Sequence, residues 1–555
     1  MANLVAPVSS MQPLEERIIE FRGLNRKSFV DEGEMSDMKN LTSDNYPLLC
    51  PRKLRGQLTL PEDVAKPLKI MTKFERIAMI AKKTDDSIAF FYNGNEVTSV
   101  TGLTEDTEMV AINTKICFFP QKTYLTLIRG SDSVTVGSFG QLSVSLTLTN
   151  AALTISNENA VLTVPSGHGL GYDDAIDISG TLYYTPSGGS ATSKAVTASC
   201  AVESASATQL TLPRETFIEL TGEGATDITF TGAINRDIPD IKHVIEWNNR
   251  LWGVSDADNT IYACKLGDPT NWKYFQGTGL DAYYAQQGTD EKWTGSAAYS
   301  GHLIFFKPNS MTKVYGTSPS SFQITNTVCY GVEPGSSKSV AIVNDTVFYK
   351  SSIGIMAYDG GTPYSISDRF NVKFSDAVGG TEGRKYYASI VTEAGEYELM
   401  VLDVDKGLWH KEDDVRFRSC CTLDGRLYFI EDIGTDDFEK DKIYIINPET
   451  ATETKLQRDW MATFGAFDEL IEDRKIYSRM SLRFIAQPGT KVSIYIKMDD
   501  GEWELVKRFA YAGTGGETVP IVPRRCDRFS IKVTGTGDCE IKSLTRRFRR
   551  GSKVK

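Results

Sequence analysis

The sequence contains few of the residues on which catalysis and metal binding most often depend. Only four of its 555 residues are histidine, and its nine cysteines are scattered, odd in number and without a C-x-x-C pair. Such cysteines predict neither a disulfide framework nor a zinc site. Phosphate-binding loops, H-E-x-x-H helices and G-x-S-x-G elbows are also absent. The sequence therefore predicts no cofactor, no metal site and no catalytic triad.

Long apolar runs are missing too. No stretch approaches the roughly 18 residues needed to span a membrane, and residues 1–21 lack the basic region and apolar core of a secretory signal. We therefore expect synthesis in a cytoplasm and no membrane span. The formal net charge of −11 disfavours wrapping of nucleic acid by phosphate neutralisation. An acidic channel lining would instead let DNA slide without sticking.

The stretch Val340–Tyr358 shows the pattern that recurs along the chain. An apolar run at Val340–Val343 precedes an Asn344–Asp345 turn, and further runs follow at Thr346–Tyr349 and Ile353–Tyr358. β-Branched and aromatic runs separated by Asn, Asp, Ser and Gly are typical of antiparallel strands. A unit this small cannot bury both faces alone, so the pattern predicts that it stacks on copies of itself.

Copies of this unit recur at intervals of 38 to 52 residues. The five clearest are Asn249-Arg250-Leu251-Trp252, Gly301-His302-Leu303-Ile304, Asp345-Thr346-Val347-Phe348, Gly383-Arg384-Lys385-Tyr386 and Gly425-Arg426-Leu427-Tyr428. Two weaker copies are Asp86-Ser87-Ile88-Ala89 and Thr114-Lys115-Ile116-Cys117. Four-stranded propeller blades repeat at roughly 40–50 residues. We therefore predict an all-β chain built on a β-propeller of six to seven blades, with an antiparallel sandwich as the alternative.

Composition divides the chain into five regions. Residues 1–70 look irregular and predict an N-terminal arm packed on the propeller, with a strand lent to the last blade as one option. Residues 71–128 predict the first blades, and residues 236–455 predict the remaining blades. Residues 129–235 predict an inserted small β-domain, and residues 456–555 predict a C-terminal β-sandwich with a basic tail.

The inserted region differs sharply in composition from its surroundings. Between residues 131 and 235 there are 30 Ser or Thr, no Trp and 12 charged residues, of which only Lys194 and Arg214 are basic. Apolar and polar residues alternate strictly in Gln141–Thr149. Such alternation indicates half-buried antiparallel strands, which favours a separate β-domain between two blades.

Two short motifs begin like metal sites but fit turns better. His168 has Asp173 and Asp174 nearby, and neither lies at a recognisable ligand spacing. The D-x-D-x-G motif at 403–407 has Asp414 where a calcium loop needs a terminal Glu. We interpret the first as a glycine-rich turn and the second as a blade hairpin.

Aromatic residues are frequent in the region of the clear blades. They could form a carbohydrate platform or pack blade against blade, and the propeller fold favours packing. They are Trp247, Trp252, Tyr262, Trp272, Trp293, Phe305, Phe306, Phe348, Tyr349, Trp409, Tyr428 and Phe429.

The C-terminal region predicts six short strands, preceded by a helix at Trp460–Ser478 that Gly465 weakens. The strands are expected at Ser481–Ile485, Lys491–Lys497, Trp503–Arg508, Glu517–Val522, Arg528–Val533 and Cys539–Leu544. The tail Arg546–Lys555 has six basic residues in ten. A solvated end and a contact with a partner or DNA are both open for it. The contact would use Arg546, Arg547, Arg549 and Arg550.

Three regions together resemble a known family. These are the GLN…GE…MKNLTSDNYPLL…R pattern at Gly23–Arg52, the interrupted propeller, and the PRRCDRFSIKVTGTG…IKSLTRRFRRGS pattern at Pro523–Ser552. They resemble tail proteins of tailed bacteriophages, above all the tail nozzle of short-tailed phages, also called the packaged-DNA stabilisation or tail hub protein. The Val164–Gly180 segment is similar to a small-barrel motif common in phage structural proteins.

The resemblance implies a structural virion protein without enzymatic activity. Family members form a ring, expected to be a homohexamer, below the portal and the head-to-tail adaptor. The ring would retain packaged double-stranded DNA without sequence specificity and conduct it during ejection. It would also contact tail fibres or distal tail proteins. The expected location is the virion tail, after synthesis in the host bacterial cytoplasm.

Two other classes of function stay open. In a receptor-binding tail protein, the aromatic residues and the Ser/Thr-rich domain would bind surface glycans. In a polysaccharide-degrading propeller, two carboxylates on central strands would cleave the substrate. The Ser-x-Asp-x-Gly-x-x-Trp repeats typical of sialidase propellers are missing, which argues against that class of enzyme.

Overall fold

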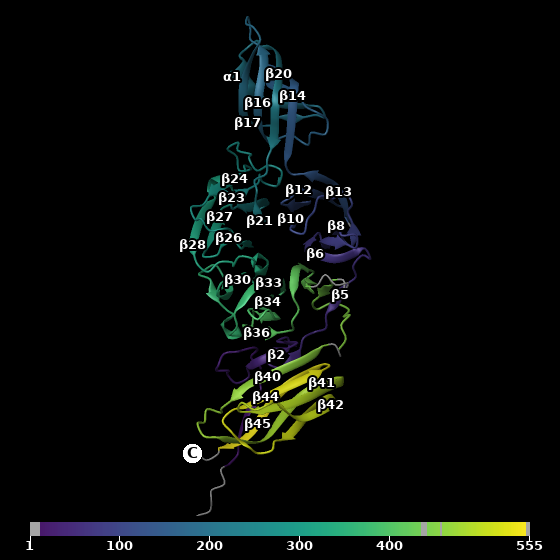
Figure 1. The fold of residues 1–555 in the computed structure, drawn as a ribbon, viewed down its shortest axis with the longest axis vertical. Coiled ribbons are helices and arrows are strands. Elements are labelled where there is room, and N and C mark those ends of the chain that lie inside the picture. The colour runs from purple at the N-terminus through teal and green to yellow at the C-terminus, as the bar shows by residue number, and fades with distance from the viewer. Residues whose placement is uncertain (1–11, 132, 435–440, 456–457, 551–555) are drawn as a thin grey trace, which may run out of the picture. The chain divides into compact units, whose positions relative to one another are not determined.

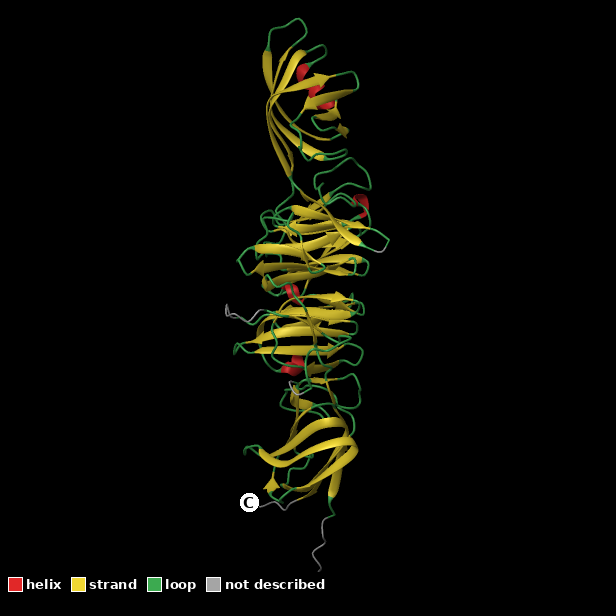
Figure 2. Cartoon of the chain, turned by 90° about the vertical axis from the view of Figure 1, so that its right-hand side faces the viewer, coloured by secondary structure: helices red, strands yellow, loops and turns green. Residues whose placement is uncertain are grey.

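The computed structural model describes residues 12–131, 133–434, 441–455 and 458–550. Within these residues the chain forms 45 strands and one α-helix (Figures 1 and 2). Three short 3-10 helices lie at Pro319–Ser321, Ser337–Ser339 and Asp368–Phe370. The chain divides into two compact units, residues 1–72 with 338–555 and residues 73–337.

Seven four-stranded antiparallel sheets confirm the predicted β-propeller at the upper end of six to seven blades. Six of them join four strands that are consecutive in the sequence. The first two blades are β6 (Val64–Lys73), β7 (Arg76–Lys83), β8 (Ile88–Tyr92) and β9 (Asn95–Glu96), then β10 (Glu108–Ile112), β11 (Lys115–Phe119), β12 (Thr123–Arg129) and β13 (Val134–Gln141).

The remaining five blades follow the inserted domain. The third and fourth are β21 (Lys242–Trp247), β22 (Arg250–Ser255), β23 (Thr260–Ala263) and β24 (Tyr283–Gln286), then β25 (Gly295–Tyr299), β26 (His302–Lys307), β27 (Ser310–Tyr315) and β28 (Gln323–Val328). The fifth and sixth are β29 (Ala341–Val343), β30 (Thr346–Ser351), β31 (Gly354–Tyr358) and β32 (Tyr364–Ser365), then β33 (Phe374–Glu382), β34 (Lys385–Thr392), β35 (Tyr397–Asp403) and β36 (Leu408–Lys411). The seventh has β37 (Phe417–Leu423), β38 (Arg426–Glu431) and β39 (Ile443–Ile445), with β5 (Gly56–Leu58) as its fourth strand.

The repeated sequence unit marks the turn into the second strand of a blade. All five clear copies and the weaker copy at 114–117 lie there, at the starts of β22, β26, β30, β34, β38 and β11. The copy at 86–89 instead lies at the start of β8, the third strand of its blade. The repeat therefore identified the blades because each needs the same hairpin at the same position.

Aromatic side chains fill the spaces between neighbouring blades, as favoured from the sequence. In one unit, Trp252 of the third blade lies edge-on to Phe322 of the fourth, with ring centroids 5.1 Å apart. In the other unit, Phe348 of the fifth blade stacks on Tyr386 of the sixth at the same centroid distance of 5.1 Å. Trp252 is fully buried and Phe348 is 3% exposed, so neither is part of a surface platform.

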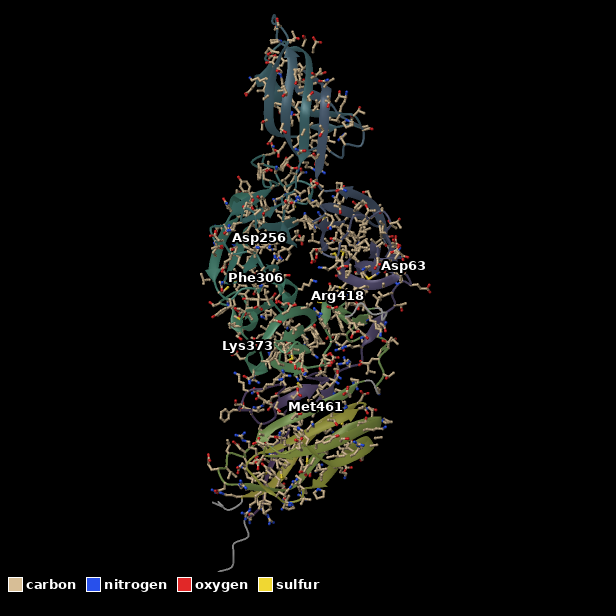
Figure 3. The ribbon with its side chains drawn as sticks, viewed as in Figure 1. Asp63, Asp256, Phe306, Lys373, Arg418 and Met461 are labelled. Atoms are coloured by element: carbon tan, nitrogen blue, oxygen red, sulfur yellow. The ribbon has the colours of Figure 1, made fainter. Side chains whose placement is uncertain are left out.

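The N-terminal arm supplies the last strand of the seventh blade. In this antiparallel ladder Gln57 of β5 lies opposite Tyr444 of β39. This confirms the option that the arm lends a strand to the last blade. On the next strand, β6, the carbonyl of Pro67 accepts a hydrogen bond of 3.0 Å from Arg418 of β37 (labelled in Figure 3). The start of the chain is thus tied to the final blade by a strand and by a side chain.

The inserted domain forms a seven-stranded sheet in the order β17-β16-β20-β14-β15-β19-β18. Its elements are β14 (Val144–Ile155), β15 (Asn159–Thr163), β16 (Ala175–Thr185), β17 (Thr192–Ala201), β18 (Ser204–Ala205), β19 (Gln209–Pro213), α1 (Glu215–Thr221) and β20 (Thr226–Arg236). A separate core that includes Leu162, Leu182, Leu210 and Phe230 lies within it. The predicted start at residue 129 is wrong, because β13 completes the second blade and the inserted strands begin at Val144.

The C-terminal domain is an eight-stranded sheet folded over one core. Its strands are β40 (Asp459–Phe467), β41 (Lys475–Met498), β42 (Glu504–Pro520), β43 (Arg525–Cys526), β44 (Phe529–Thr536) and β45 (Cys539–Arg550), joined by β1 (Leu14–Ile18) and β2 (Met35–Lys39) of the arm. The long β41 pairs with β45 in its first half and with β44 in its second half, while β42 runs along its other edge. Alternate side chains of β41, such as Leu482, Phe484, Ile494 and Ile496, enter the shared core.

Three C-terminal predictions need correction. Residues 460–467 form a strand rather than the start of a helix, and the two strands expected at 481–485 and 491–497 are parts of one strand, β41. The basic tail is not a loose end up to Arg550, because β45 pairs with β41 and β1. The predicted tail residues 551–555, like residues 1–11 of the predicted arm, lie outside the described residues.

Candidate functional site

The N-terminal arm joins the last blades to the C-terminal domain. β1 and β2 extend the C-terminal sheet by pairing with β45 and β40. Between these two strands, the backbone of Leu24 donates to the carbonyl of Trp409 at 2.7 Å. Arg26 donates two hydrogen bonds of 2.8 Å to the carboxylate of Glu398. The arm is therefore part of the packed structure of this unit, with β3 (Leu41–Thr42) and β4 (Cys50–Pro51) forming a small hairpin within it.

A buried group of five charged side chains, called here the arm cluster, fixes the end of the arm. Arg52 donates to Glu453 at 2.8 and 2.9 Å. Arg55 contacts Glu412 at 2.8 Å and Asp413 at 2.7 Å. Both arginines are 5% exposed. Because a buried charge is costly unless it is paired, these contacts hold the arm against the segment that follows β36.

The electrostatics of the arm cluster favour the ionised state. Burial alone would raise the pKa of the Asp413 carboxyl, but the neighbouring Arg55 and Arg52 guanidiniums outweigh it and lower that pKa. Burial opposes and Arg52 favours ionisation of Glu453, whose pKa is also lowered. The cluster therefore consists of ion pairs at neutral pH, which suits a fixed joint better than a proton-transfer site.

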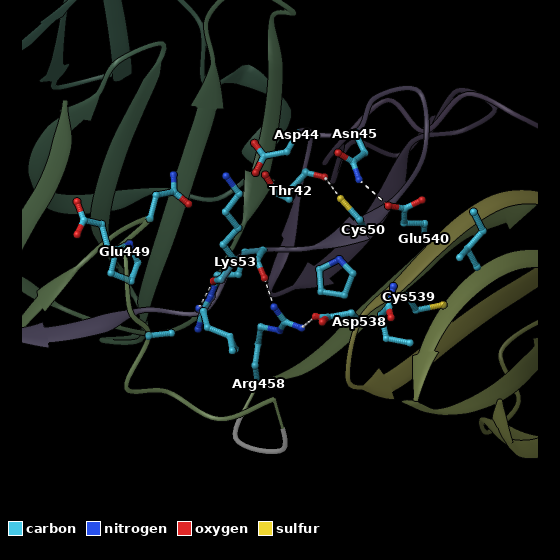
Figure 4. A pocket seen from close by; sticks show the side chains of 18 residues that line it. Thr42, Asp44, Asn45, Cys50, Lys53, Glu449, Arg458, Asp538, Cys539 and Glu540 are labelled. Carbon is cyan, nitrogen blue, oxygen red and sulfur yellow. Dashed lines mark hydrogen bonds and ion pairs between the residues drawn. The ribbon is translucent and has the colours of Figure 1, made fainter. Parts of the chain in front are cut away.

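A cavity of about 420 Å³ lies beside the arm cluster (Figure 4). The arm, the segment after β39 and the C-terminal domain contribute its walls. Its lining residues are Thr42, Asp44, Asn45, Cys50, Pro51, Arg52, Lys53, Leu54, Asn447, Pro448, Glu449, Ala451, Arg458, Ile485, Gln487, Asp538, Cys539 and Glu540.

The polar groups of this cavity are largely bonded to one another. Asn45 donates to Glu540 at 2.9 Å, and the buried Arg458 pairs with Asp538. Burial raises the pKa of the Cys50 thiol to about 11, so the thiol is protonated at neutral pH and is a poor nucleophile. Among the described lining residues we find no nucleophile paired with a base. The arrangement can hold three segments together, and no reaction follows from it.

A second polar joint, called here the insertion clamp, connects the inserted domain to the third blade. Lys265, Asn271 and Tyr274 lie in the loop between β23 and β24. Tyr274 donates to Asp173 at 2.8 Å, and Asn271 donates to Asp174 at 3.1 Å. Lys265 forms an ion pair with Asp173. The loop thus binds Asp173 and Asp174, which directly precede β16.

Asp174 is the centre of the insertion clamp. It is 5% exposed and pairs with Arg236, which is equally buried at the end of β20. It also accepts a hydrogen bond of 2.7 Å from the backbone of Gly171. Asn271, 1% exposed, completes its contacts. One carboxylate therefore links the end of β20, where the chain leaves the inserted domain, to the loop of the third blade.

The four arginines predicted as partner or DNA contacts lie on β45, in different surroundings. Arg546 is 3% exposed and bonds to Glu469 at 2.6 and 3.0 Å. Arg547 lies 3.5 Å from Glu15 and Arg550 lies 2.6 Å from Asp473. Arg549 is exposed. Arg546 is neutralised inside the domain by Glu469. The predicted contact with a partner or DNA therefore stays a prediction chiefly for Arg547, Arg549 and Arg550.

The four histidines occupy structural positions. His168 bonds to the carbonyl of Ser206 at 2.8 Å, and its other ring nitrogen accepts from the backbone of Leu170, as in the predicted turn. His243 contacts the carbonyl of Trp293, and His302 packs on Tyr299 and Tyr315. Burial lowers the pKa of His410 to about 4.

Among the described residues, no three His, Cys, Asp or Glu side chains are grouped as a metal site would need. The motif at 403–407 forms the predicted hairpin between β35 and β36, with Asp403 bonded to Lys406 at 2.8 Å and to Ser43 at 2.5 Å. No helix in the described part of the chain has both the length and the apolar character of a membrane span.

Comparison with known proteins gives structural matches of very low similarity. No family model and no curated protein matches the chain. The WD40 domain of SCAP from fission yeast has a TM-score of 0.27 and 9% identity over 78% of this chain and 98% of that one. An exo-beta-1,3-galactanase from Phanerochaete chrysosporium has a TM-score of 0.22 and 9% identity over 55% of this chain and 94% of that one. PorZ, a surface component of the Porphyromonas gingivalis type-IX secretion system, has a TM-score of 0.25 and 12% identity over 89% and 78% of the two chains. Such values carry no argument about function.

Sequence reasoning missed both joints. Arg52 was noted only as the last residue of the Gly23–Arg52 pattern, and Arg55, Glu412 and Asp413 were not singled out. Their partners lie hundreds of positions away, so no local spacing could have paired them.

Proposed function

We propose that this chain is a structural subunit of a bacteriophage tail, which assembles into a ring that acts as the nozzle or hub. The ring retains packaged DNA below the portal and adaptor and conducts it during ejection. The family resemblance at Gly23–Arg52 and Pro523–Ser552 supports this proposal. The propeller supplies broad lateral surfaces through which copies associate head to tail.

The observation that carries the proposal is a set of uncharged blade edges. β13 (VTVGSFGQ), β24 (YYAQ) and β28 (QITNTV) contain no Asp, Glu, Lys or Arg, and each is the last strand of its sheet. Val136, Tyr284 and Val328 on these strands are 38%, 60% and 90% exposed. Natural proteins usually protect such edges with charge because an open edge pairs with another chain. Edges left uncharged suit a subunit that is covered on assembly.

The edge at β13 also has a recess beside it. Val134 and Val136 line a cavity of about 350 Å³ together with Tyr92, Asn93 and residues 95–99. An apolar side chain of a neighbouring copy could enter this space. The recess therefore gives the uncharged edge of β13 a shape into which a neighbouring copy can fit.

The test is the assembly state of the purified protein. We expect native mass spectrometry and negative-stain microscopy to show a closed ring, expected to have six copies. Val328→Lys should shift the protein toward monomers, because it places a charge at the exposed edge of β28. Val522→Lys, at a residue 75% exposed between β42 and β43, is the matched control and should leave the ring unchanged.

A monomer at all concentrations would contradict the proposal. A ring that survives Val328→Lys would remove β28 from the interface while leaving the ring itself intact. Co-purification with an adaptor ring or with fibre proteins would identify the neighbouring parts of the tail.

A second candidate is binding of surface glycans. Tyr284 is 60% and Phe275 is 48% exposed, and their ring centroids lie 5.7 Å apart. Tyr262 lies next to Tyr284, and its hydroxyl bonds to Asp258. Exposed aromatic rings beside a carboxylate can stack on sugars. Binding on a glycan array that Tyr284→Ala abolishes would favour this candidate over the ring.

The third candidate, a polysaccharide-degrading propeller, needs two free carboxylates. Glu412 and Asp413, the adjacent buried carboxylates of the arm cluster, are both bound to arginines. Turnover of a polysaccharide that a single Glu or Asp substitution removes would establish this class. Without it, the structural role stands as the proposal.

A further inference from the structure

The C-terminal domain has a charge opposite to that of the rest of the chain. Residues 459–555 contain 19 Lys or Arg and 13 Asp or Glu, a net charge of +6, although the whole chain has −11. Residues 131–235, in contrast, have a net charge of −8. Such an asymmetry within one chain points to an acidic partner for the basic part.

Four of the described cations of this domain that have no ion pair lie on one face of the C-terminal sheet. Lys491 and Lys497 lie on β41, Arg508 on β42 and Lys532 on β44. In register, Ser493 lies opposite Arg508 on one side and Thr534 on the other, and Tyr495 lies opposite Lys532. Arg508 donates to Ser493 at 3.2 Å, which places both on the same face. We call this surface the basic face.

The four cations of the basic face have no acidic partner among the described residues. Several other cations of the domain are paired, such as Lys507 with Glu517 and Arg524 with Glu504, each at 2.5 Å. Lys39, at the border of the face, is neutralised by Asp459 at 3.0 Å. Four uncompensated positive charges on one sheet surface repel each other, so a bound anion would stabilise the face.

The face is hollowed between its strands. A cavity of about 760 Å³ opens along it, lined by Lys491, Ser493, Tyr495 and Arg508 on one side and by residues 534–536 and β40 on the other. Met461 of β40, labelled in Figure 3, lies at this border. Lys491 and Lys497 are six positions apart on one strand, which corresponds to roughly 20 Å. Of the four cations only Lys491 and Arg508 line the groove, so the charged surface extends beyond it and suits an extended ligand rather than a single small anion.

The aromatic residues of the face position a cation. Lys532 lies 4.4 Å from the ring centroid of Trp503 and 5.3 Å from that of Tyr495. The ammonium group is thus held between two rings by cation–π attraction. Because Lys532 already occupies these rings, they are poorly placed to stack on unpaired bases, as single-strand binding would require. Contact with a phosphate backbone fits the arrangement better.

We propose that the basic face binds the phosphate backbone of double-stranded DNA without reading its sequence. The four cations supply the charge, and the serine and threonine hydroxyls between them supply hydrogen-bond donors to phosphate oxygens. The choice of DNA rests on the proposed tail function, whereas the anionic character of the ligand follows from the face alone.

The experiment measures binding of the full chain to a fluorescent duplex of about 30 base pairs at several salt concentrations. Four phosphate contacts predict a slope of log affinity against log salt near −3.6, since each contact contributes about −0.9. The double variant Lys491→Gln/Arg508→Gln should reduce the slope by about 2 and weaken binding at least about tenfold at low salt. Lys491→Gln/Lys497→Gln is a second variant that leaves the Arg508–Ser493 bond intact.

The matched control is Lys507→Gln/Arg524→Gln, which removes the same charge from the same domain at paired positions. It should bind nearly as the unmodified chain does. Equal losses in control and face variants would overturn the proposal, because net charge alone would explain them. Loss on Arg549→Gln/Arg550→Gln, with no loss on the face variants, would assign binding to β45 instead.

Two further outcomes separate this inference from the proposed function. Ring assembly is measured independently by native mass spectrometry. DNA binding without a ring would therefore support the inference about the basic face and contradict the proposed nozzle function. A ring whose basic face binds polyglutamate but not DNA would reject the inference and indicate an acidic protein partner. Thermal melting of each variant shows that it is folded before binding is compared.

Discussion

A single buried histidine connects the stability of the propeller to pH. His410 lies on β36, is 3% exposed and has its pKa lowered to about 4, first by burial and then by the nearby Lys385. The carboxylates of Asp403 and Asp44 oppose this shift without reversing it. The neutral imidazole is therefore the form that the folded chain accommodates.

We expect acid to destabilise the protein through His410. The unfolded chain binds a proton below about pH 6.5 and the folded chain only near pH 4, so stability is lost as pH falls through this window. The loss should be about 2 kcal/mol between pH 7.5 and pH 5. Urea unfolding followed across this range should show a flatter pH profile for His410→Gln, and an unchanged profile would contradict the assignment.

At the scale of single elements, the closing strand β5 is short for its task. It spans only Gly56–Leu58, and a ladder of three residues adds little stability. The arm cluster lies directly beside it, because Arg55 precedes the strand and contacts Glu412 and Asp413. The ion pairs of Arg55 therefore hold β5 in the seventh blade, where its short backbone ladder alone would not.

Removal of Arg55 should release β5 from the seventh blade. Arg55→Ala leaves two carboxylates buried without that partner, which costs about 3–5 kcal/mol. Hydrogen exchange at β39, residues 443–445, should accelerate accordingly. Arg524→Ala, which breaks an ion pair that is about half exposed, is the control and should leave this exchange unchanged. Normal protection of β39 in Arg55→Ala would show that the ladder suffices.

The elements also show why some were predictable from the sequence and others were not. Hairpins of the blades repeat, so each copy supports the others. β40 has no copy, and Trp460, Phe464 and Phe467 follow one another at helical spacing. This strand resembles a helix in sequence because a bulge between Phe464 and Phe467 breaks the alternation of apolar and polar residues that a strand normally shows. A bulge depends on the partner strand, here β44, and leaves no local signature.

The candidate joints were unpredictable for a related reason. Asp174 was considered as a ligand for His168, its neighbour in sequence, but it pairs with Arg236 and Asn271. A buried carboxylate forms an ion pair with a cation that is near it in the folded chain. That cation can be identified only once the positions of the strands are known. The sequence therefore indicated which domains exist but not which side chains join them.

At the scale of the whole molecule, the inserted domain is an independent addition to the propeller. Its core is separate from those of the blades, and its first and last strands pair with each other, with Val144 opposite Arg236. Chain entry and exit therefore lie side by side, so a short linker can replace the domain. We expect it to serve as a docking platform for fibres or distal tail parts.

Deletion of residues 144–235 with a short Gly-Ser linker should leave blades two and three folded and the ring assembled. It should abolish attachment of the distal parts, measured by co-purification. Asp174→Ala in the full chain is the comparison, since it breaks the insertion clamp but keeps the domain, and should increase proteolysis near residues 171–174. Loss of the ring on deletion would contradict this division of roles.

The strand that completes the seventh blade also sets a schedule for biosynthesis. β5 leaves the ribosome early, yet the strand it must pair with, β39, emerges after all six of the other blades. At about 5–20 residues per second this interval lasts roughly 20–80 s. During that time β5 has no partner strand, and the seventh blade of the propeller stays incomplete. Completion of the fold is thereby coupled to near-completion of translation, which delays formation of any surface that needs the closed circle.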